Sequence, residues 1–339
     1  MKCQTIMYRY QEIKEVHLEL TERCNAACPM CARNINGSSI LHSELDNSEI
    51  RLEDAKRIFI PDFISQLTRL HLCGNYGDSI VAKDCLEIIR YFRENNNELN
   101  ILFSTNGGAR SSKWWKELAS ILGPKGEVIF SIDGLQDTNH IYRQNVNWKI
   151  LERSFKSFIS AGGKAAWSFL IFRHNEHQVE KAKELAKEWG FKQFYAKHTL
   201  RFKGKSSYLA IDSINNKAFD LRPPKIFPKK DALHQSKENR QHIDCFAIRE
   251  KTIYVSARQL LHPCCHTGHF NSCTAVDDSV LDLKKYSIKE ILDSGSFNNI
   301  KNSWNNYETA EPVCKKLCSV TENEKSRKVK TGIINIINF

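Results

Sequence analysis

Strand-like runs alternate with amphipathic helical patterns from residue 15 to residue 198 of the chain. The runs rich in β-branched and aromatic residues are residues 15–20, 69–74, 99–107, 127–134, 165–172 and 192–198. The helical patterns between them are residues 51–67, 82–95, 112–123, 150–163 and 176–191. Strands that alternate with helices form parallel sheets, and right-handed crossovers would curl these β/α units into a partial (β/α)6 TIM-like barrel. We therefore expect an α/β fold.

The polar, glycine-rich and cysteine-rich segments come directly after the strands. In barrels of parallel strands, the chemistry sits at the C-terminal ends of the strands. All of these segments are therefore expected at one mouth of the barrel. They are residues 24–31, residues 74–78, residues 104–107, Ser131 with Asp133, residues 173–175, and His198 with Arg201.

The chain has twelve cysteines, which is many for a protein without a visible export signal. The first ten residues contain no apolar signal core, and no apolar run approaches the ~20 residues needed to cross a bilayer. We therefore expect a cytoplasmic protein with no membrane partner. A reducing cytosol disfavours disulfides, so spaced cysteines there usually bind metal or act in catalysis.

The segment CNAACPMC places Cys24, Cys28 and Cys31 in a C-x3-C-x2-C motif directly after the first expected strand. Three thiolates on one loop are able to hold three irons of a 4Fe–4S cluster and leave the fourth iron open to another ligand. The alternative is a zinc site, which would need a fourth ligand, and His42 is the nearest candidate.

This motif and its position resemble those of the radical S-adenosylmethionine (radical SAM) superfamily, and the resemblance covers residues 12–205. It implies that the amino and carboxylate groups of SAM chelate the open iron. Reductive cleavage would then give methionine and a 5′-deoxyadenosyl radical that abstracts hydrogen from a substrate. A flavodoxin, a ferredoxin or a dedicated reductase would supply the electron.

The resemblance also implies SAM contacts at the ends of the later strands. The segment CGNYGDS (73–79) matches the place of the family's Gly-Gly-Glu stretch, which contacts the SAM amino group, although an aspartate stands where glutamate is usual. The segment STNG (104–107) matches the region near the SAM ribose and carboxylate. The implied SAM-binding residues in these two segments are Gly74, Asn75, Gly77, Asp78, Ser104 and Asn106.

The segment from Ser131 to Arg143 is similar to a fourth-strand segment of the subgroup with C-terminal clusters. There Ser131 would face the ribose, Asp133 would belong to the same site, and Arg143 would pair with the SAM carboxylate, since a guanidinium matches carboxylate geometry. Met30 stands where an aromatic residue beside adenine is common. Each segment alone is also an ordinary strand-to-turn sequence, so the interpretation depends on their order and shared location.

A second cysteine set consists of Cys245, Cys264, Cys314 and Cys318. Four thiolates complete a 4Fe–4S cluster with no open iron. The pattern resembles the twitch or SPASM auxiliary-cluster domain and implies one additional cluster. Cys265 or Cys273 could replace one of these ligands, and a zinc knuckle built from the same four cysteines is the alternative.

The domain division expected from these patterns is a radical SAM partial barrel at 1–205, a linker at 206–240, a twitch/SPASM-like auxiliary-cluster domain at 241–320, and a basic tail at 321–339. The formal net charge is +11, which fits a solvated basic face better than a nucleic-acid-binding surface, because no RNA-binding motif accompanies it.

Dehydrogenase-type oxidation, with the second cluster as electron acceptor, is the leading hypothesis for the reaction. The alternatives are modification or crosslinking of a peptide, modification of a nucleotide or nucleic-acid base, and a non-enzymatic metal-bearing nucleic-acid-binding module. No motif identifies the substrate, which could be a small molecule or a peptide. The candidate catalytic residues at the expected mouth are His198, Arg173 and Arg201.

Overall fold

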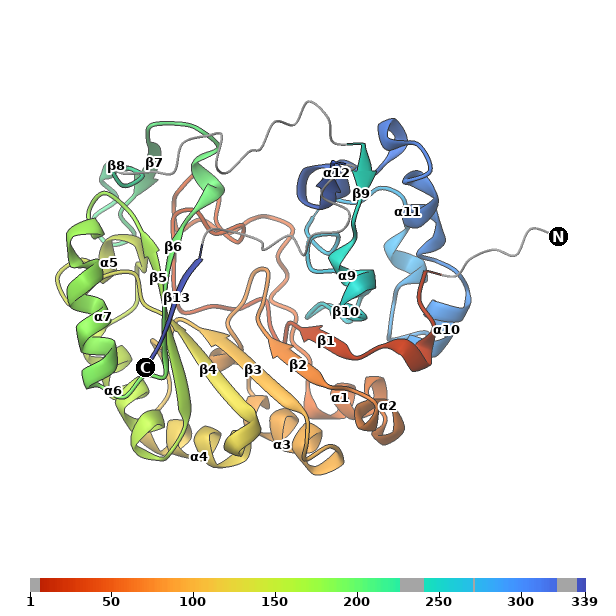
Figure 1. Ribbon diagram of the computed structural model, residues 1–339, viewed down its shortest axis with the longest axis horizontal. Helices are drawn as coiled ribbons and strands as arrows, with labels where there is room; N and C mark the ends of the chain where they lie inside the picture. Colours follow the sequence, from red (N-terminus) through yellow and green to blue (C-terminus); the bar gives the residue numbers. More distant parts are fainter. Residues whose placement is uncertain (1–6, 226–240, 271, 322–333) are drawn as a thin grey trace.

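The computed structural model describes residues 7–225, 241–270, 272–321 and 334–339. Nine strands form one sheet in the order β11-β10-β1-β2-β3-β4-β5-β6-β13. Six consecutive parallel strands make up its centre, which confirms the expected partial (β/α)6 barrel (Figure 1). Their bounds are β1 Glu15–Leu18, β2 Arg69–Leu72, β3 Asn100–Thr105, β4 Gly126–Ser131, β5 Lys164–Ile171 and β6 Gln193–His198.

Three further strands extend this sheet at its two edges. β10 (Thr252–Val255) runs parallel to β1, and β11 (Leu261–His262) pairs antiparallel with β10. β13 (Ile334–Asn338) pairs antiparallel with β6, so an apolar C-terminal segment covers the other edge. The segment that carries some of the C-terminal cysteines is thus hydrogen-bonded into the same sheet as the barrel strands.

The helices that follow the strands cover the outer, convex face of the sheet (Figure 1). They are α1 Leu52–Ile58, α2 Pro61–Ser65, α3 Cys85–Asn95, α4 Ser112–Leu122, α6 Trp148–Ser160 and α7 Val179–Glu188. The short α5 (Asn139–Tyr142) follows β4 at the mouth of the barrel, where Tyr142 contacts Phe172 and Arg201. The single helix expected at 51–67 is two helices, because Pro61 lacks the N–H that a continuing helix needs and instead begins α2. The side chain of Ser111 caps α4, and Gly123 ends it with a positive φ of 58°.

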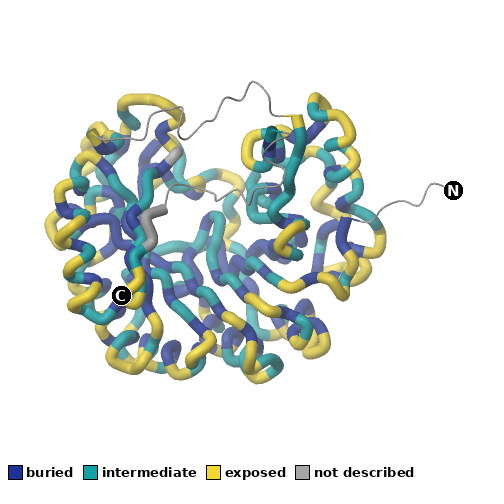
Figure 2. The backbone as a smooth tube through the Cα atoms, viewed as in Figure 1, coloured by how far each residue is buried: buried dark blue, intermediate teal, exposed yellow. Residues whose placement is uncertain are grey.

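Aromatic side chains fill the layer between these helices and the sheet. Trp115 of α4 packs against Phe130 of β4, and Phe155 of α6 packs against Phe191. Trp167 of β5 stacks on Trp189 at the end of α7. Complete burial of each such side chain contributes about 1.5–3 kcal/mol, and Figure 2 shows the sheet strands as the most buried part of the fold.

The opposite face of the sheet, inside the barrel, is polar and only partly buried. The strand period of two places apolar side chains toward the helices and the intervening residues toward the interior. In β4, for example, Val128 and Phe130 are buried while Ser131 is intermediate. The interior side chains include His17, His71, Ser104, Ser131, Tyr195 and Lys197. This polar concave face is available for substrate rather than for core packing.

The C-terminal cysteine region packs beside β1 and consists of short elements (Figure 1). They are β9 His242–Ile243, α9 Phe246–Arg249, α10 Ile288–Asp293, α11 Asn298–Ser303, α12 Pro312–Cys318 and β12 Ser319–Val320. Within the segment expected to be a linker, β7 (Tyr208–Ile211) and β8 (Ala218–Leu221) form a hairpin. The rest of that linker, 226–240, and residues 322–333 of the expected basic tail lie outside the described residues. The domain boundaries stay a prediction.

A search of the described residues finds no helix with the length and apolar character needed to span a bilayer.

Candidate active site

The loop after β1 carries the first three cysteines at the expected mouth of the barrel. Cys28 is buried, and Cys24 and Cys31 are half-buried beside the core. The backbone N–H of Cys31 donates to the carbonyl of Cys28 at 3.0 Å, and the N–H of Ala26 donates to Cys24 Sγ at 3.4 Å. One backbone donor of the loop, the N–H of Ala26, is therefore directed at the Cys24 sulfur, and such a bond stabilises the thiolate.

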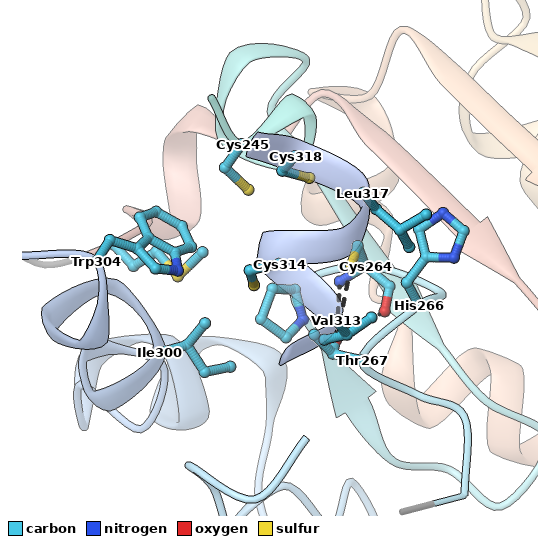
Figure 3. A pocket seen from close by; sticks show the side chains of 12 residues that line it. Cys245, Cys264, His266, Thr267, Ile300, Trp304, Val313, Cys314, Leu317 and Cys318 are labelled. Atoms are coloured by element: carbon cyan, nitrogen blue, oxygen red, sulfur yellow. Dashed lines mark hydrogen bonds between the residues drawn. The ribbon is translucent and has the colours of Figure 1, made fainter. Parts of the chain in front are cut away.

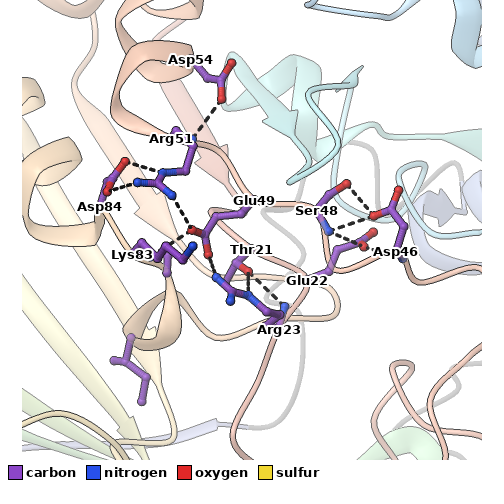
Figure 4. A network of polar contacts seen from close by, with 12 residues as sticks. Thr21, Glu22, Arg23, Asp46, Ser48, Glu49, Arg51, Asp54, Lys83 and Asp84 are labelled. Atoms are coloured by element: carbon purple, nitrogen blue, oxygen red, sulfur yellow. Dashed lines mark hydrogen bonds and ion pairs between the residues drawn. The ribbon is translucent and has the colours of Figure 1, made fainter.

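A network of ion pairs holds this loop in place on its N-terminal side (Figure 4). Glu49 accepts a hydrogen bond from Arg23, the residue before Cys24, and from the backbone N–H of Lys83 at 3.2 Å. Arg51 forms a bidentate pair with Asp84 at 2.6 and 2.9 Å.

The adjacent carboxylate of Glu22 joins the same loop to the C-terminal region. It accepts from Arg258 Nε at 2.6 Å and from the N–H groups of Asp46 and Ser48 at 3.2 Å. Because Glu22 is 1% exposed, loss of these partners would leave a buried charge without compensation. The ion pairs thus hold the cysteine loop in one position relative to its neighbours.

Arg143 connects the cysteine loop to the end of β4. Its Nη1 lies 3.7 Å from Cys28 Sγ, and its Nε donates to Asp133 Oδ2 at 2.6 Å. Burial raises the pKa of Cys28 to about 11, and the Arg143 charge opposes this shift. Burial also raises the pKa of Asp133, again against the opposing charge of Arg143. The guanidinium is therefore placed to favour the thiolate form of Cys28 that metal binding requires.

Asn106 makes a similar connection from the end of β3. Its Nδ2 lies 3.6 Å from Cys24 Sγ and 2.7 Å from Asp78 Oδ2. Asp78 is buried and also accepts from the N–H of Asn106 at 2.7 Å and from Thr105 Oγ1 at 3.0 Å. These bonds make Asp78 a link between the loops after β2 and β3, and its expected contact with the SAM amino group stays a prediction.

The glycine-rich segment after β2 packs closely against the loop after β1. A Cβ atom on Gly77 would lie 1.7 Å from the carbonyl oxygen of Thr21, and one on Gly74 would lie 2.6 Å from Glu19 Oε1. Glu19 is fully enclosed and accepts from the N–H groups of Tyr76 and Gly77 at 2.7 and 3.2 Å. Glycine is therefore required here by close approach, and Glu19 is an organising residue that the motif reasoning missed.

Three other expected SAM-binding residues have contacts at the same mouth. Asn75 Nδ2 donates to the carbonyl of Cys265 at 2.7 Å, so it faces the C-terminal cysteine region. Ser104 Oγ lies 3.1 Å from His71 Nε2. Met30 is buried, and its carbonyl accepts from Arg201 Nη1 at 2.9 Å. Ser131 ends β4 on the interior face.

The three candidate catalytic residues lie in different surroundings. Arg201 reaches the cysteine loop through Met30, as described. Arg173 pairs with Glu176 at 3.7 Å and donates to the carbonyl of Pro223 at 3.3 Å, which holds it beside β8. His198 lies in register with Ile171, on the face of β6 that packs toward the helices.

Lys197 is the interior residue at the end of β6, and the sequence reasoning missed it. Burial lowers its pKa, while the charges of Asp133 and Cys73 raise it, and its Nζ lies 5.3 Å from the centre of the Tyr195 ring. The signal was present in the sequence, because Phe194 and Ala196 mark the helix-facing side of this strand and leave Lys197 on the interior.

The four C-terminal cysteines line one pocket (Figure 3). Cys245 precedes α9, Cys264 follows β11, and Cys314 and Cys318 lie on α12, four residues apart and therefore on one helix face. The hollow between them measures about 320 Å³, including space open to solvent. Cys264 lines it, whereas Cys265 and Cys273 do not belong to its lining.

The fit of both cysteine sets to metal groups depends on their spacing and their donors. Among the described residues, no three His, Cys, Asp or Glu side chains are grouped so as to hold a metal ion. In an iron–sulfur cluster each thiolate binds a different iron, so the sulfurs surround a space instead of one ion. The pocket of four cysteines offers such a space. Trp304 Nε1 in its lining and Tyr8 Oη, on the residue after the lining residue Met7, are buried without hydrogen-bond partners of ordinary geometry. The four cysteines and these two donors therefore fit an iron–sulfur cluster, whose sulfur atoms accept hydrogen bonds.

No protein-family model matches the chain. Among curated proteins, PqqA peptide cyclase of Xanthomonas campestris pv. campestris is 28% identical over 191 residues, which is 54% of this chain and 46% of the relative. FeMo cofactor biosynthesis protein NifB of Methanocaldococcus jannaschii is 26% identical over 115 residues, 33% of this chain and 38% of that protein. The chain thus spans less than half the length of the curated relatives it matches.

Similar solved structures include Streptococcus suis SuiB bound to its precursor peptide SuiA. That structure superposes with a TM-score of 0.57 at 13% identity, covering 92% of this chain and 77% of SuiB. The enzyme anSMEcpe with bound AdoMet superposes with a TM-score of 0.55 at 15% identity, covering 95% of this chain and 90% of that one. At these identities the superpositions show a shared fold.

Proposed function

We propose that this chain, a radical SAM protein, binds SAM and two 4Fe–4S clusters and uses radical chemistry to modify a peptide. The observation that carries the proposal is the loop of Cys24, Cys28 and Cys31 at the mouth of a parallel half barrel, with Asn106 and Arg143 donating toward two of its sulfurs. When bound there, the cluster and SAM supply a 5′-deoxyadenosyl radical that removes a hydrogen atom from substrate.

The chain's own residues would hold and orient these groups. Cys24, Cys28 and Cys31 would bind three irons, and the donors on Arg143 and Asn106 would stabilise the charged thiolates. The ion pair between Arg143 and Asp133 keeps the guanidinium in one orientation at the end of β4. The close packing of Gly77 on Thr21 brings the backbone after β2 against the cysteine loop.

A peptide substrate is favoured over a small alcohol or amine by the relatives. PqqA peptide cyclase shares the longest curated match, and SuiB was solved with a precursor peptide. The interior of the barrel offers polar side chains for such a substrate, and we assign Lys197 to contact it, because the alternation of β6 places this residue on the interior face. A flavodoxin or ferredoxin is the proposed electron donor.

Dehydrogenase-type oxidation of a small molecule is the second candidate. It is favoured by the pocket of Cys245, Cys264, Cys314 and Cys318, since a closed cluster there would accept an electron from a substrate radical.

The test is an anaerobic assay of the reconstituted chain with SAM, a reductant and the short peptides encoded beside its gene. We expect 5′-deoxyadenosine together with a modified peptide whose mass changes in the spectrum. Cys24→Ala should abolish both products, while Cys85→Ala, a buried cysteine of α3 outside both sets, should retain them. Formation of 5′-deoxyadenosine with no peptide turned over, but with a small alcohol or amine oxidised, would favour the second candidate.

A further inference from the structure

Two hydrogen-bond donors are buried at the four-cysteine pocket: Trp304 lines it, and Tyr8 directly follows the lining residue Met7. Tyr8 is 2% exposed, and its hydroxyl has no hydrogen-bond partner of ordinary geometry, nor has the indole N–H of Trp304. Native proteins satisfy nearly all buried polar atoms, because an unpaired one forfeits its hydration without compensation. Two such donors at one pocket indicate that an acceptor belongs inside it.

Both donors lie close to the cysteines: Trp304 shares the pocket lining with all four, and Tyr8 interacts electrostatically with all four. Burial raises the pKa of the Tyr8 hydroxyl most, and Cys245, Cys264, Cys318 and Cys314 all raise it further, so the hydroxyl lies within electrostatic reach of the whole set. Burial raises the pKa of Cys314 to about 12, and the Trp304 indole N–H partly offsets this. Figure 3 shows Trp304 and Ile300 at the side of the hollow that Cys314 faces.

The two side chains are held there by separate parts of the chain. Met7 lines the pocket, and its backbone N–H donates to Asn298 Oδ1 at 3.1 Å. The Tyr8 ring packs edge-on against the Phe297 ring, with 6.1 Å between the two centroids. Trp304 directly follows α11. The N-terminal segment is therefore anchored to α11, and the donors reach the pocket from fixed backbone positions.

We propose that Tyr8 Oη–H and Trp304 Nε1–H donate hydrogen bonds to the sulfur atoms of an iron–sulfur cluster held by the four cysteines, and that they thereby raise its reduction potential. The proposal rests on the second cluster of the proposed function. One-electron reduction adds negative charge to the cluster sulfurs and makes them stronger acceptors, so donors stabilise the reduced form more than the oxidised form. A cluster with a raised potential is a better acceptor for an electron from substrate.

The test measures the potential of this cluster alone. A full-length background variant with Cys24, Cys28 and Cys31 changed to alanine retains only the C-terminal set, and EPR-monitored redox titration then reports one cluster. Tyr8→Phe removes only the hydroxyl, and Trp304→Phe removes the indole N–H. We expect each substitution to reduce the equilibrium constant for cluster reduction about tenfold, which lowers the midpoint potential by about 59 mV for one electron. The iron content should stay unchanged.

Tyr91→Phe is the matched control, because the Tyr91 hydroxyl donates to the carbonyl of Phe59 at 2.8 Å, in the barrel. Its potential should equal that of the background variant. An unchanged or higher potential in a fully loaded Tyr8→Phe or Trp304→Phe variant would overturn the proposal for that residue.

A second measurement covers the case in which a variant does not load its cluster. Electron–nuclear double resonance of the background variant in H₂O and D₂O should detect exchangeable protons coupled to the reduced cluster. Absence of such protons would refute the proposal. If the background variant binds no 4Fe–4S cluster at all, the assignment of a second cluster is refuted, and this proposal with it. A negative result in the peptide assay would refute only the proposed substrate, because the measured potentials do not depend on it.

Discussion

At the scale of single residues, Arg143 combines three functions in one side chain. It donates toward Cys28 Sγ and forms an ion pair with Asp133. Its guanidinium carbon also lies 5.4 Å from the centre of the Tyr142 ring, in a cation–π contact. Asp133 in turn accepts from the N–H of Leu170 at 2.6 Å, so β5 also fixes the pair. The electrostatics of the cysteine loop therefore depend on the carboxylate of Asp133, whose expected place in the SAM site stays a prediction.

Asp133→Asn should lower the free energy of unfolding by about 3–5 kcal/mol, because it leaves a buried guanidinium without its counter-charge. Urea denaturation of the metal-free chain, followed by circular dichroism, measures this loss. Asp220→Asn is the control, since its pair with Arg222 is largely exposed and should contribute less than about 1 kcal/mol. Equal losses in the two variants would contradict the assignment.

The stacked rings of His17 and His71 make stability depend on pH. Their centroids are 4.9 Å apart, and burial lowers the pKa of His17 to about 4 and that of His71 to about 3. Below the usual histidine pKa of 6.5, the unfolded chain binds protons that the folded chain does not. Their contribution to stability is therefore complete above about pH 6.5 and is lost as the pH falls toward 4.

Replacement of one of these histidines should reduce the pH dependence accordingly. In His17→Gln, the slope of unfolding free energy against pH between about 4.5 and 6 should fall by about 1.4 kcal/mol per pH unit, which is one proton. The exposed His177 is the control, and His177→Gln should leave the slope as it was. A slope unaltered by His17→Gln would show that His17 is protonated in the folded chain.

At the scale of elements, the chain depends on glycine for two different reasons at two places. Gly77 must lack a Cβ because the Thr21 carbonyl occupies that position, whereas Gly162, in the turn after α6, has open space but a φ of 85°. Only the first constraint comes from tertiary contact.

Gly77→Ala should therefore displace the loop after β1 and cost about 3 kcal/mol or more, with lower iron loading of the first cysteine set. Gly162→Ala should lower the free energy of unfolding by only about 1–2 kcal/mol, the cost of placing an alanine in the left-handed conformation. It should leave iron loading intact. Thermal denaturation and iron analysis of both variants provide the comparison. Normal iron content in Gly77→Ala would show that the loop adapts.

The individual elements also show where local sequence was sufficient. Every expected barrel strand is present, because each carries apolar residues that are buried on its helix-facing side. The prediction of one continuous helix at 51–67 was wrong, because Pro61 in this segment ends the first helix and begins a second. β10 and β13 were not anticipated, since short strands at sheet edges are defined by the partner they pair with rather than by their own pattern.

At the scale of the whole molecule, one continuous sheet connects the two proposed cysteine sets, because β1 precedes Cys24 and β11 precedes Cys264. Loading with two 4Fe–4S clusters predicts about eight irons and eight sulfides per chain after anaerobic reconstitution. Changing Cys24, Cys28 and Cys31 to alanine, or Cys314 and Cys318 to alanine, should each leave about four irons. A single zinc per chain with negligible iron would contradict both cluster assignments.

The spacing of the cysteines and the alternation of strands and helices were determined by the sequence alone. Both are local properties, because ligand spacing within one loop and side-chain periodicity within one element involve neighbours along the chain. They were enough to predict the barrel, the mouth that carries the polar segments, and the two cysteine sets.

The tertiary structure alone decided which side chains face one another across those segments. It placed Lys197 instead of His198 on the interior face and used Asp78 to join two loops. It also brought Trp304 into the lining of the four-cysteine pocket and Tyr8 within electrostatic reach of the same cysteines. These contacts join residues separated by tens to hundreds of positions. Their energies depend on burial and on partners that no local pattern encodes.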